Sequence, residues 1–266
     1  TFRDPQTMCG IAGYLIRERD ACIDPAVITA MTDAMAHRGP DGEGAWINGP
    51  VGLGHRRLAI IDIATGGQPM ANEDESLWIV CNGEIYNYRE LRRDLARHHT
   101  LRTQSDTEVI LHLYEEFGER CLEHLNGMFA FAIWDIRQQR LFLARDRFGI
   151  KPLYWTIGPR HFAFASEIKA LLAAGACDAK PNAEALAEYF TFQYTLRDRT
   201  LFDGVQQLEP GHYLTFRPFQ DVAPSDVRYW DLSYQIDTHH TFEYFQERLL
   251  ELLEESVILQ LRSDVP

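Results

Sequence analysis

A cysteine stands in the heptapeptide MCGIAGY, residues 8–14, directly after a methionine and ahead of small and apolar residues. If the chain is cut after Met8, Cys9 becomes the first residue and carries both a thiol and a free α-amine. An α-amine has a pKa of about 7.7–8.0, so it can accept the thiol proton near neutral pH. The heptapeptide therefore predicts a nucleophile and a base within one residue. The alternative is a buried structural cysteine, the usual fate of a free thiol.

Arg57 precedes the apolar run of residues 58–61, which we predict to be a buried strand. An arginine at the end of a buried strand is well placed to hold a carboxylate through two parallel hydrogen bonds. Its neighbour Arg56 is expected to be an ordinary solvated side chain.

Asn82, Gly83 and Glu84 follow a predicted strand over residues 77–80. An Asn-Gly pair ordinarily indicates a hairpin turn. Here, however, a predicted helix over residues 88–97 follows instead of a second strand. The side-chain amide of Asn82 and the backbone N–H of Gly83 would form a suitable donor pair for a developing oxyanion. Glu84 supplies a carboxylate suited to an ammonium group.

A second carboxylate, Asp106, lies in the sequence Ser-Asp-Thr-Glu at residues 105–108, which predicts a capping box at the start of a helix that ends at Gly118. Asp106 is then either a favourable charge in the first helical turn or a second ligand for an ammonium group. The spacing alone does not separate these two interpretations.

The elements that must position these residues alternate short strands with helices. Asp24 and Pro25 predict a helix start, with apolar residues at helical spacing behind them. The loop HRGPDGEG, residues 37–44, has no strand before it and no helix after it, so a nucleotide-binding loop is not indicated. Further on we predict an antiparallel meander of four strands over residues 128–134, 140–144, 153–155 and 161–165. Two helices should follow, over residues 166–174 and 182–192. A short strand over residues 212–216 and a long amphipathic helix over residues 241–261 complete the predicted elements.

The composition excludes several classes. The 266 residues are 45% hydrophobic and 24% charged, which is typical of a globular protein with a sizeable core. A net charge of −13 argues against nucleic acid or an anionic membrane as a partner, and no apolar run reaches the ~20 residues that span a bilayer. The five cysteines show no CxxC spacing and the ten histidines no HExxH, so no metal site is predicted; His98-His99 and His239-His240 are expected to be exposed pairs. Free cysteines fit a reducing, cytoplasmic location.

Eight separated segments together resemble the glutamine-hydrolysing asparagine synthetases, and they occur in the order found in that family. The resemblance extends over nearly all of the chain from Met8 onward. The segments are MCGIAGY, MAHRGPDGEG, GHRRLAIID, NGEIYNYRELR, SDTEVILHLYEEFG, LNGMFAFAIWD, LARDRFGIKPLYW and FASEIKALL.

The resemblance implies an α+β fold, a four-layer α/β/β/α sandwich of antiparallel sheets of the N-terminal nucleophile hydrolase type, acting as a class II glutamine amidotransferase. Cys9 would attack the side-chain amide of L-glutamine and form a thioester, with its α-amine as base and then acid. Asn82 and Gly83 would form the oxyanion hole. The remaining glutamine-binding residues implied are Arg57 for the α-carboxylate, Glu84 and Asp106 for the α-ammonium, and the backbone of Leu58, Ala59, Ile60 and Ile61.

The same resemblance implies a domain division. Residues 1–8 would be a leader or extension, residues 9–220 the glutaminase domain, and residues 221–266 a linker and the first helix of a truncated synthetase domain. No cofactor is implied for the glutaminase half, whereas the synthetase half would use ATP and Mg. The implied partners are L-glutamine and a synthetase domain that receives ammonia, and a homodimer is a possible assembly.

Three alternatives remain open. The ammonia acceptor of the complete enzyme could be something other than aspartate, because acceptor choice resides in the synthetase half. The domain could also have kept the fold as a binding module without catalysis, although Cys9, Arg57, Asn82 and Asp106 are all present. A hydrolase using Thr1 as nucleophile is disfavoured, because the polar residues after it do not form a buried strand.

Overall fold

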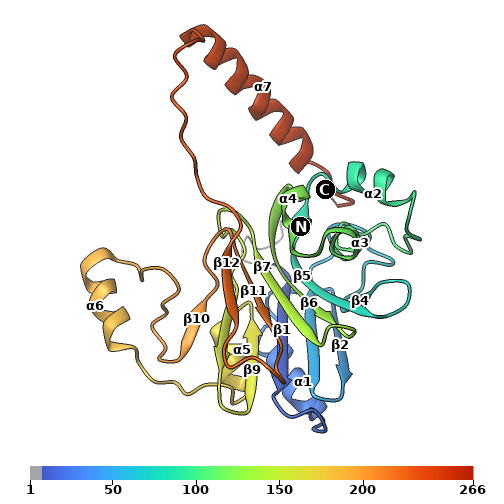
Figure 1. The fold of residues 1–266 in the computed structure, drawn as a ribbon, viewed down its shortest axis with the longest axis vertical. Coiled ribbons are helices and arrows are strands. Elements are labelled where there is room, and N and C mark those ends of the chain that lie inside the picture. Colours follow the sequence, from blue (N-terminus) through green and yellow to red (C-terminus); the bar gives the residue numbers. More distant parts are fainter. Residues whose placement is uncertain (1–7, 266) are drawn as a thin grey trace.

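The computed structural model describes residues 8–265, so all of the expected leader except Met8 lies outside the described part. Two six-stranded antiparallel sheets form the centre of the molecule (Figure 1). Sheet A has the order β10-β8-β9-β1-β3-β2, and sheet B has the order β12-β11-β7-β6-β5-β4. The strands of sheet A are β1 (Gly10–Ile16), β2 (Gly42–Asn48), β3 (Val51–Arg57), β8 (Tyr154–Ile157), β9 (His161–Ala165) and β10 (Val205–Gln207). Those of sheet B are β4 (Met70–Ala71), β5 (Leu77–Ile85), β6 (Gly127–Asp135), β7 (Arg140–Arg145), β11 (His212–Phe216) and β12 (Ser225–Arg228).

Three separate apolar cores hold four layers together. The central core joins the two sheets through side chains such as Leu53 and Phe162 from sheet A and Leu143 from sheet B. A second core lies between sheet A and the helices α1 (Pro25–Asp33) and α5 (Ile168–Ala173). A third lies between sheet B and α2 (Tyr88–Leu95), α3 (Glu108–Phe117) and α4 (Cys121–His124), next to the 3-10 turn Gly118–Arg120. The predicted α/β/β/α sandwich is confirmed.

Several local expectations are confirmed with their physical reasons. Asp24 accepts a hydrogen bond from the Ala26 N–H and Pro25 opens α1, as expected. Gly118 ends α3 with a φ of 58°, a conformation that favours glycine. Helix α6 (Ala183–Phe192) begins after Asn182, whose side chain accepts from the Ala185 N–H.

The Asn-Gly pair does not form a hairpin turn, because both residues lie within β5. Asn82 pairs with Ala130 of β6, and Gly83 pairs with Phe129. A Cβ on Gly83 would lie 2.3 Å from the Met128 carbonyl oxygen and 2.6 Å from the Phe129 Cα. Glycine is therefore required at residue 83 because the neighbouring strand approaches so closely.

Three expectations about secondary structure are wrong. Residues 58–61 are not a strand; they are buried or half-buried irregular chain that follows β3. The expected meander is divided, since β6 and β7 belong to sheet B and β8 and β9 to sheet A. The crossover between them is held by the buried Asp146 carboxylate, which accepts from the N–H groups of Phe148, Ile150 and Lys151. The capping box also fails, because Ser105 Oγ accepts from Thr107 and the Glu108 carboxylate accepts from the preceding loop.

The chain leaves sheet B after β12, which pairs antiparallel with β11. The extended segment that follows runs away from the sandwich, and helix α7 (Phe242–Gln260) returns toward it, so that the chain after α7 contacts Glu90 at α2 (Figure 1). The apolar stripe of α7 is exposed, with Phe245, Leu249, Leu252, Leu253 and Val257 all between 44% and 60% accessible. Within residues 8–265, no helix is both long and apolar enough to cross a membrane.

Candidate functional site

A cavity of about 290 Å³ opens at the end of the two sheets where β1 begins and β5 ends. It brings together residues that lie as far apart in the sequence as Met8 and Lys151. Of the predicted site residues, Ala59 is not among its lining residues; it is buried, and its N–H donates to the Asp41 carboxylate at 2.9 Å. The lining consists of Met8, Cys9, Arg57, Leu58, Ile60, Ile61, Gly66, Gln68, Cys81, Asn82, Gly83, Glu84, Ser105, Asp106, Thr107, Met128 and Lys151.

The Cys9 thiol faces the backbone of the segment after β3. Its Sγ lies 3.5 Å from the Leu58 carbonyl oxygen and accepts from the Leu58 N–H at 3.3 Å. Burial raises the pKa of Cys9, whereas the Leu58 hydrogen bond and the positive charges of Lys151 and Arg57 lower it. The thiol therefore needs a nearby base to be deprotonated at neutral pH.

Arg38 fixes the backbone of the cysteine and was not predicted from the sequence. Its buried guanidinium donates from Nε to the Cys9 carbonyl oxygen at 2.9 Å and from Nη1 to Glu167 at 2.9 Å. The Arg38 carbonyl in turn accepts from the Met8 N–H at 2.9 Å. Arg38 thus holds the start of β1 from the helical side of sheet A. The sequence indicated only a turn at this position, since nothing local shows that an arginine in a loop is buried.

The donor pair predicted for an oxyanion is oriented by the strand geometry of β5. Asn82 is 1% exposed, and within residues 8–265 its Nδ2 has no hydrogen-bond partner. The N–H groups of Cys81 and Ile85 point off the free edge of β5, to Gln68 Oε1 at 2.6 Å and to Asp106 Oδ2 at 2.9 Å. Backbone N–H groups two residues apart in a strand point the same way. The Gly83 N–H lies between them and therefore points off the same edge of β5, toward the cavity.

The two predicted carboxylates, Glu84 and Asp106, lie together in the cavity. Burial raises the pKa of Glu84, and only the charge of Lys151 lowers it. The pKa of Asp106 rises from 3.8 to about 6, mainly through burial, partly offset by the Ile85 N–H and reinforced by the negative charge of Glu84. Carboxylates with raised pKa values bind a cation favourably, because a cation removes the cost of their burial.

Arg57 ends β3 instead of preceding a strand, and its side chain lines the cavity. Its guanidinium donates from Nη1 to the Ile63 carbonyl at 3.0 Å and from Nη2 to the carbonyls of Ile61 and Asp62 at 3.4 and 2.5 Å. A guanidinium has five N–H donors, so these three contacts leave two donors for a ligand. The expectation of a solvated Arg56 is wrong: its side chain is 14% exposed and pairs with Asp33 and Glu43.

The loop that receives Arg57 is also joined to the far end of the chain. The Asp62 N–H donates to Asp264 Oδ2 at 2.7 Å, next to the carbonyl that accepts from Arg57. The Asp62 carboxylate accepts from the N–H groups of Thr65 and Gln104, at 2.9 and 2.8 Å. Asp62 has a φ of 50°, so this loop turns sharply at the residue that makes all of these contacts.

Lys151 is the other functional candidate that sequence reasoning missed. It is 7% exposed, lines the cavity, and places Nζ 3.3 Å from Met8 Sδ. Burial lowers its pKa, and the nearby Glu84 raises it. Lys151 is one of only three lysines in a chain rich in arginine. The sequence feature that could have drawn attention to Lys151 is its position in the turn after β7, within the segment FGIKPLYW.

The comparisons with known proteins agree with this geometry. A family model for the glutamine amidotransferase domain matches residues 8–230. Asparagine synthetase [glutamine-hydrolyzing] 3 of Bacillus subtilis is 39% identical over 263 residues, covering 97% of this chain and 42% of the relative. Amidase chry2 of Gibberella zeae is 35% identical, covering 97% of this chain and 40% of the relative. The chain thus spans less than half the length of these two relatives.

The sandwich itself has solved counterparts. The glutamine phosphoribosylpyrophosphate amidotransferase of B. subtilis aligns with a TM-score of 0.59 at 21% identity, covering 84% of this chain and 49% of that chain. An allosteric regulatory enzyme of purine biosynthesis aligns with a TM-score of 0.60 at the same identity and coverage. These likenesses confirm the fold. Because the family match runs through both sheets and spans the whole cavity, the chain belongs to the family of glutamine amidotransferase domains.

Proposed function

We propose that this domain hydrolyses the side-chain amide of L-glutamine to glutamate and ammonia, with Cys9 as the nucleophile. The observation that carries the proposal is the buried Nδ2 of Asn82, which has no hydrogen-bond partner among residues 8–265 and lies in the wall of the cavity that holds the Cys9 thiol. A buried donor without an acceptor costs stability. A donor of this kind is expected where an acceptor arrives with the substrate, and an oxyanion is the strongest such acceptor.

The chemistry uses residues that all line the one cavity. The Cys9 thiolate adds to the amide carbon of glutamine, and the oxygen becomes an oxyanion held by Asn82 Nδ2 and the Gly83 N–H. The α-ammonium of Cys9, having taken the thiol proton, gives it to the amide nitrogen as the C–N bond breaks, so that ammonia leaves and a thioester remains on Cys9. Water then cleaves the thioester and releases glutamate. Two donors of Arg57 bind the substrate α-carboxylate, and the Glu84 and Asp106 carboxylates bind its α-ammonium.

This mechanism requires removal of the chain through Met8, because an amide nitrogen on Cys9 cannot act as a base. Met8 itself lines the cavity, and its Sδ contacts Lys151. Its removal therefore both frees the α-amine and opens space beside the thiol. Residues 1–7, the rest of the expected leader, lie outside the described residues.

We further propose that the ammonia feeds a synthetase domain that amidates aspartate with ATP and Mg, and that residues 221–266 are the linker and first helix of that domain. The asparagine synthetases of B. subtilis and the exposed apolar stripe of α7 support this assignment. The amidases among the relatives favour one alternative, an acceptor other than aspartate.

The decisive experiment compares two forms of the chain, one beginning at Cys9 and one retaining residues 1–8. We expect only the first to release glutamate from glutamine and to be labelled at Cys9 by a glutamine-analogue chloroketone, located by peptide mass spectrometry. Cys9→Ala should abolish both signals. Cys22→Ala, which removes an exposed thiol, should change neither. Equal turnover by both forms would show that the α-amine is not the base, and no turnover by either would favour a binding module.

A further inference from the structure

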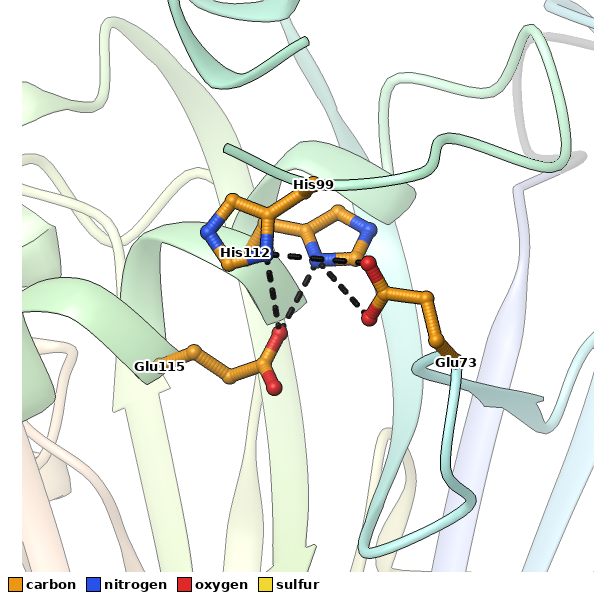
Figure 2. Close-up of side chains that lie close together, drawn as sticks. All are labelled: Glu73, His99, His112 and Glu115. Atoms are coloured by element: carbon orange, nitrogen blue, oxygen red, sulfur yellow. Dashed lines mark hydrogen bonds and ion pairs between the residues drawn. The ribbon is translucent and has the colours of Figure 1, made fainter. Parts of the chain in front are cut away.

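A second cluster of titratable side chains lies on the outer, helical side of sheet B, away from the glutamine cavity. It consists of Glu73, His99, His112 and Glu115, and one ligand-type atom of each lies within 4.8 Å of the others (Figure 2). His99 was expected to be an exposed surface residue, but its side chain is only 14% exposed. The side chain of His112 is 1% exposed, and those of Glu73 and Glu115 are 30% and 23% exposed.

The four side chains come from three segments that are brought together only by the fold. Glu73 lies in the loop between β4 and β5, His99 follows α2, and His112 and Glu115 lie three residues apart on α3. Residues three apart on a helix share one face. In Figure 2 the two imidazoles and the two carboxylates turn toward a common centre.

The distances suit a tetrahedral metal ion. The Nδ1 atom of His99 lies 3.7 Å from Glu73 Oε1 and 3.6 Å from Glu115 Oε2. The Nδ1 atom of His112 lies 3.6 Å from Glu73 Oε2 and 2.9 Å from Glu115 Oε2. Zn–N and Zn–O bonds of 2.0–2.2 Å place neighbouring ligand atoms of a tetrahedron about 3.3–3.5 Å apart. The four distances lie on both sides of that value, with Glu73 facing His99 and His112 through different oxygens, so side-chain rotations would bring one atom of each residue around a single ion.

The surroundings of His99 and Glu115 also match those of metal ligands. A metal-binding histidine usually donates its other ring N–H to a carboxylate, which fixes the ring and its tautomer. The Nε2 of His99 lies 3.1 Å from Glu116 Oε1, on the side of the ring away from the cluster. The Nε2 of His112 faces Glu108 Oε1 at 3.9 Å, beyond hydrogen-bond distance. The Glu115 carboxylate accepts from Asn72 Nδ2 at 2.8 Å, which leaves its other oxygen for an ion.

We propose that Glu73, His99, His112 and Glu115 bind one first-row divalent metal ion of the Zn²⁺ type as a structural site. Two imidazole nitrogens and two carboxylate oxygens are ligands that Zn²⁺ accepts. Two neutral imidazoles and two carboxylates together also balance the charge of one divalent cation. The ion would join the β4–β5 loop and the segment after α2 to helix α3. It would take no part in glutamine hydrolysis, because none of its four ligands lines the glutamine cavity.

The test is metal binding by the purified chain after treatment with a chelator. Zn²⁺ is titrated in competition with a chromophoric chelator, and Co²⁺ is used as a spectroscopic probe. We expect one Zn²⁺ per chain, a raised unfolding midpoint on its addition, and a tetrahedral Co²⁺ spectrum without the ultraviolet charge-transfer band of a thiolate ligand. The last observation distinguishes the cluster from the free cysteines.

Variants of the partly exposed ligands locate the site without disturbing the buried His112. His99→Gln and Glu73→Gln should each weaken Zn²⁺ binding by more than about 100-fold, and Glu116→Gln, which removes only the carboxylate behind His99, by about 10- to 100-fold. The matched control is His98→Gln, the exposed neighbouring histidine, which should bind as the parent chain does.

Three results would overturn the proposal: no bound Zn²⁺, equal binding by the parent and by His99→Gln and Glu73→Gln, or a thiolate spectrum with Co²⁺. The cluster would then be an ion-pair network held by protons. Glutamine hydrolysis should not change in the same variants, because none of the four cluster residues lines the cavity that holds Cys9.

Discussion

Asp106 and Glu108 stand two residues apart at the start of α3, and both are buried, yet their environments are opposite. Asp106 faces the glutamine cavity, where burial and the neighbouring Glu84 raise its pKa to about 6. Burial also acts on Glu108, but the nearby His112 imidazole and hydrogen bonds from Arg102 and Thr103 outweigh it and lower the pKa to about 2. The Asp106 carboxylate lacks a positively charged partner that would offset its burial, whereas the Glu108 carboxylate is already compensated by hydrogen bonds. The comparison shows that a buried charge indicates a binding site only where the fold leaves it uncompensated.

Two asparagines repeat the contrast. Asn72 and Asn82 are each 1% exposed. Asn72 uses both ends of its amide, donating to Ser76 and Glu115 and accepting from the Leu77 N–H. Asn82 leaves its Nδ2 without a partner within residues 8–265. We interpret the first as structural and the second as part of the catalytic machinery.

The largest change in activity is expected from substitution of Asn82, with Asn72 as its structural counterpart. Asn82→Ala should lower kcat for glutamine hydrolysis by about 100- to 1000-fold, the typical loss on removal of one oxyanion donor, with little change in stability. Asn72→Ala should instead lower the free energy of unfolding, because it leaves the Leu77 N–H and Glu115 without their partner. Steady-state kinetics and urea unfolding of the two variants measure both effects. If Asn82→Ala lost stability but kept kcat, the contrast between the asparagines would not hold.

The second effect concerns the two carboxylates. Glu108→Gln should lose about 2–3 kcal/mol of unfolding free energy at pH 7, since its pKa falls from 4.5 to about 2 in the folded chain. A lowered pKa stabilises the fold above pH 4.5, and this contribution disappears as the pH falls toward 2. Asp106→Asn should be neutral or stabilising at pH 7, but it should raise the KM for glutamine about 10- to 100-fold, the loss expected for a hydrogen bond to a charged group. Urea unfolding at several pH values, combined with kinetics, separates the two residues. Similar stability losses in both variants would contradict the comparison.

The smallest effect is a pH dependence. Because the pKa of Asp106 is raised to about 6, the free enzyme protonates it below that pH and loses a partner for the substrate ammonium. The value of kcat/KM should therefore fall about tenfold per pH unit below pH 6. The same shift means that acidification from pH 6 to 4 favours the folded state through this residue. Asp106→Asn should remove the acidic limb near pH 6, and its persistence in that variant would assign the limb to another group.

Much of the fold could be predicted from the sequence, because the core strands are short apolar runs and helices α1, α6 and α7 begin at side-chain caps. Cys9, Asn82 and Asp106 were found because each is a reactive or polar residue next to a predicted strand or helix. The run of residues 58–61 was mistaken for a strand, since an irregular segment buried in a cavity wall is as apolar as a strand. The division of the meander between two sheets depends on the buried Asp146, whose hydrogen bonds are not visible in a pattern of hydrophobicity.

The functional candidates that the sequence did not reveal were missed because only the tertiary fold brings them together. Arg38 and Lys151 lie in turns, and only tertiary packing makes them buried and brings them to Cys9. The cluster around His112 joins residues up to 42 positions apart, from Glu73 to Glu115, at no spacing that a metal motif would show. Sequence spacing detects ligands on one element, whereas these ligands come from three.

The loop at Asp62 links the cavity to the C-terminal part of the chain. Its carbonyl accepts from Arg57 in the glutamine cavity, and its N–H donates to Asp264, just after α7. Both contacts are made by one residue, so we expect a shift of the Arg57 guanidinium to displace the chain at residue 264 as well. If glutamine binds in the cavity and moves Arg57, the displacement would reach Asp264 through the backbone of Asp62.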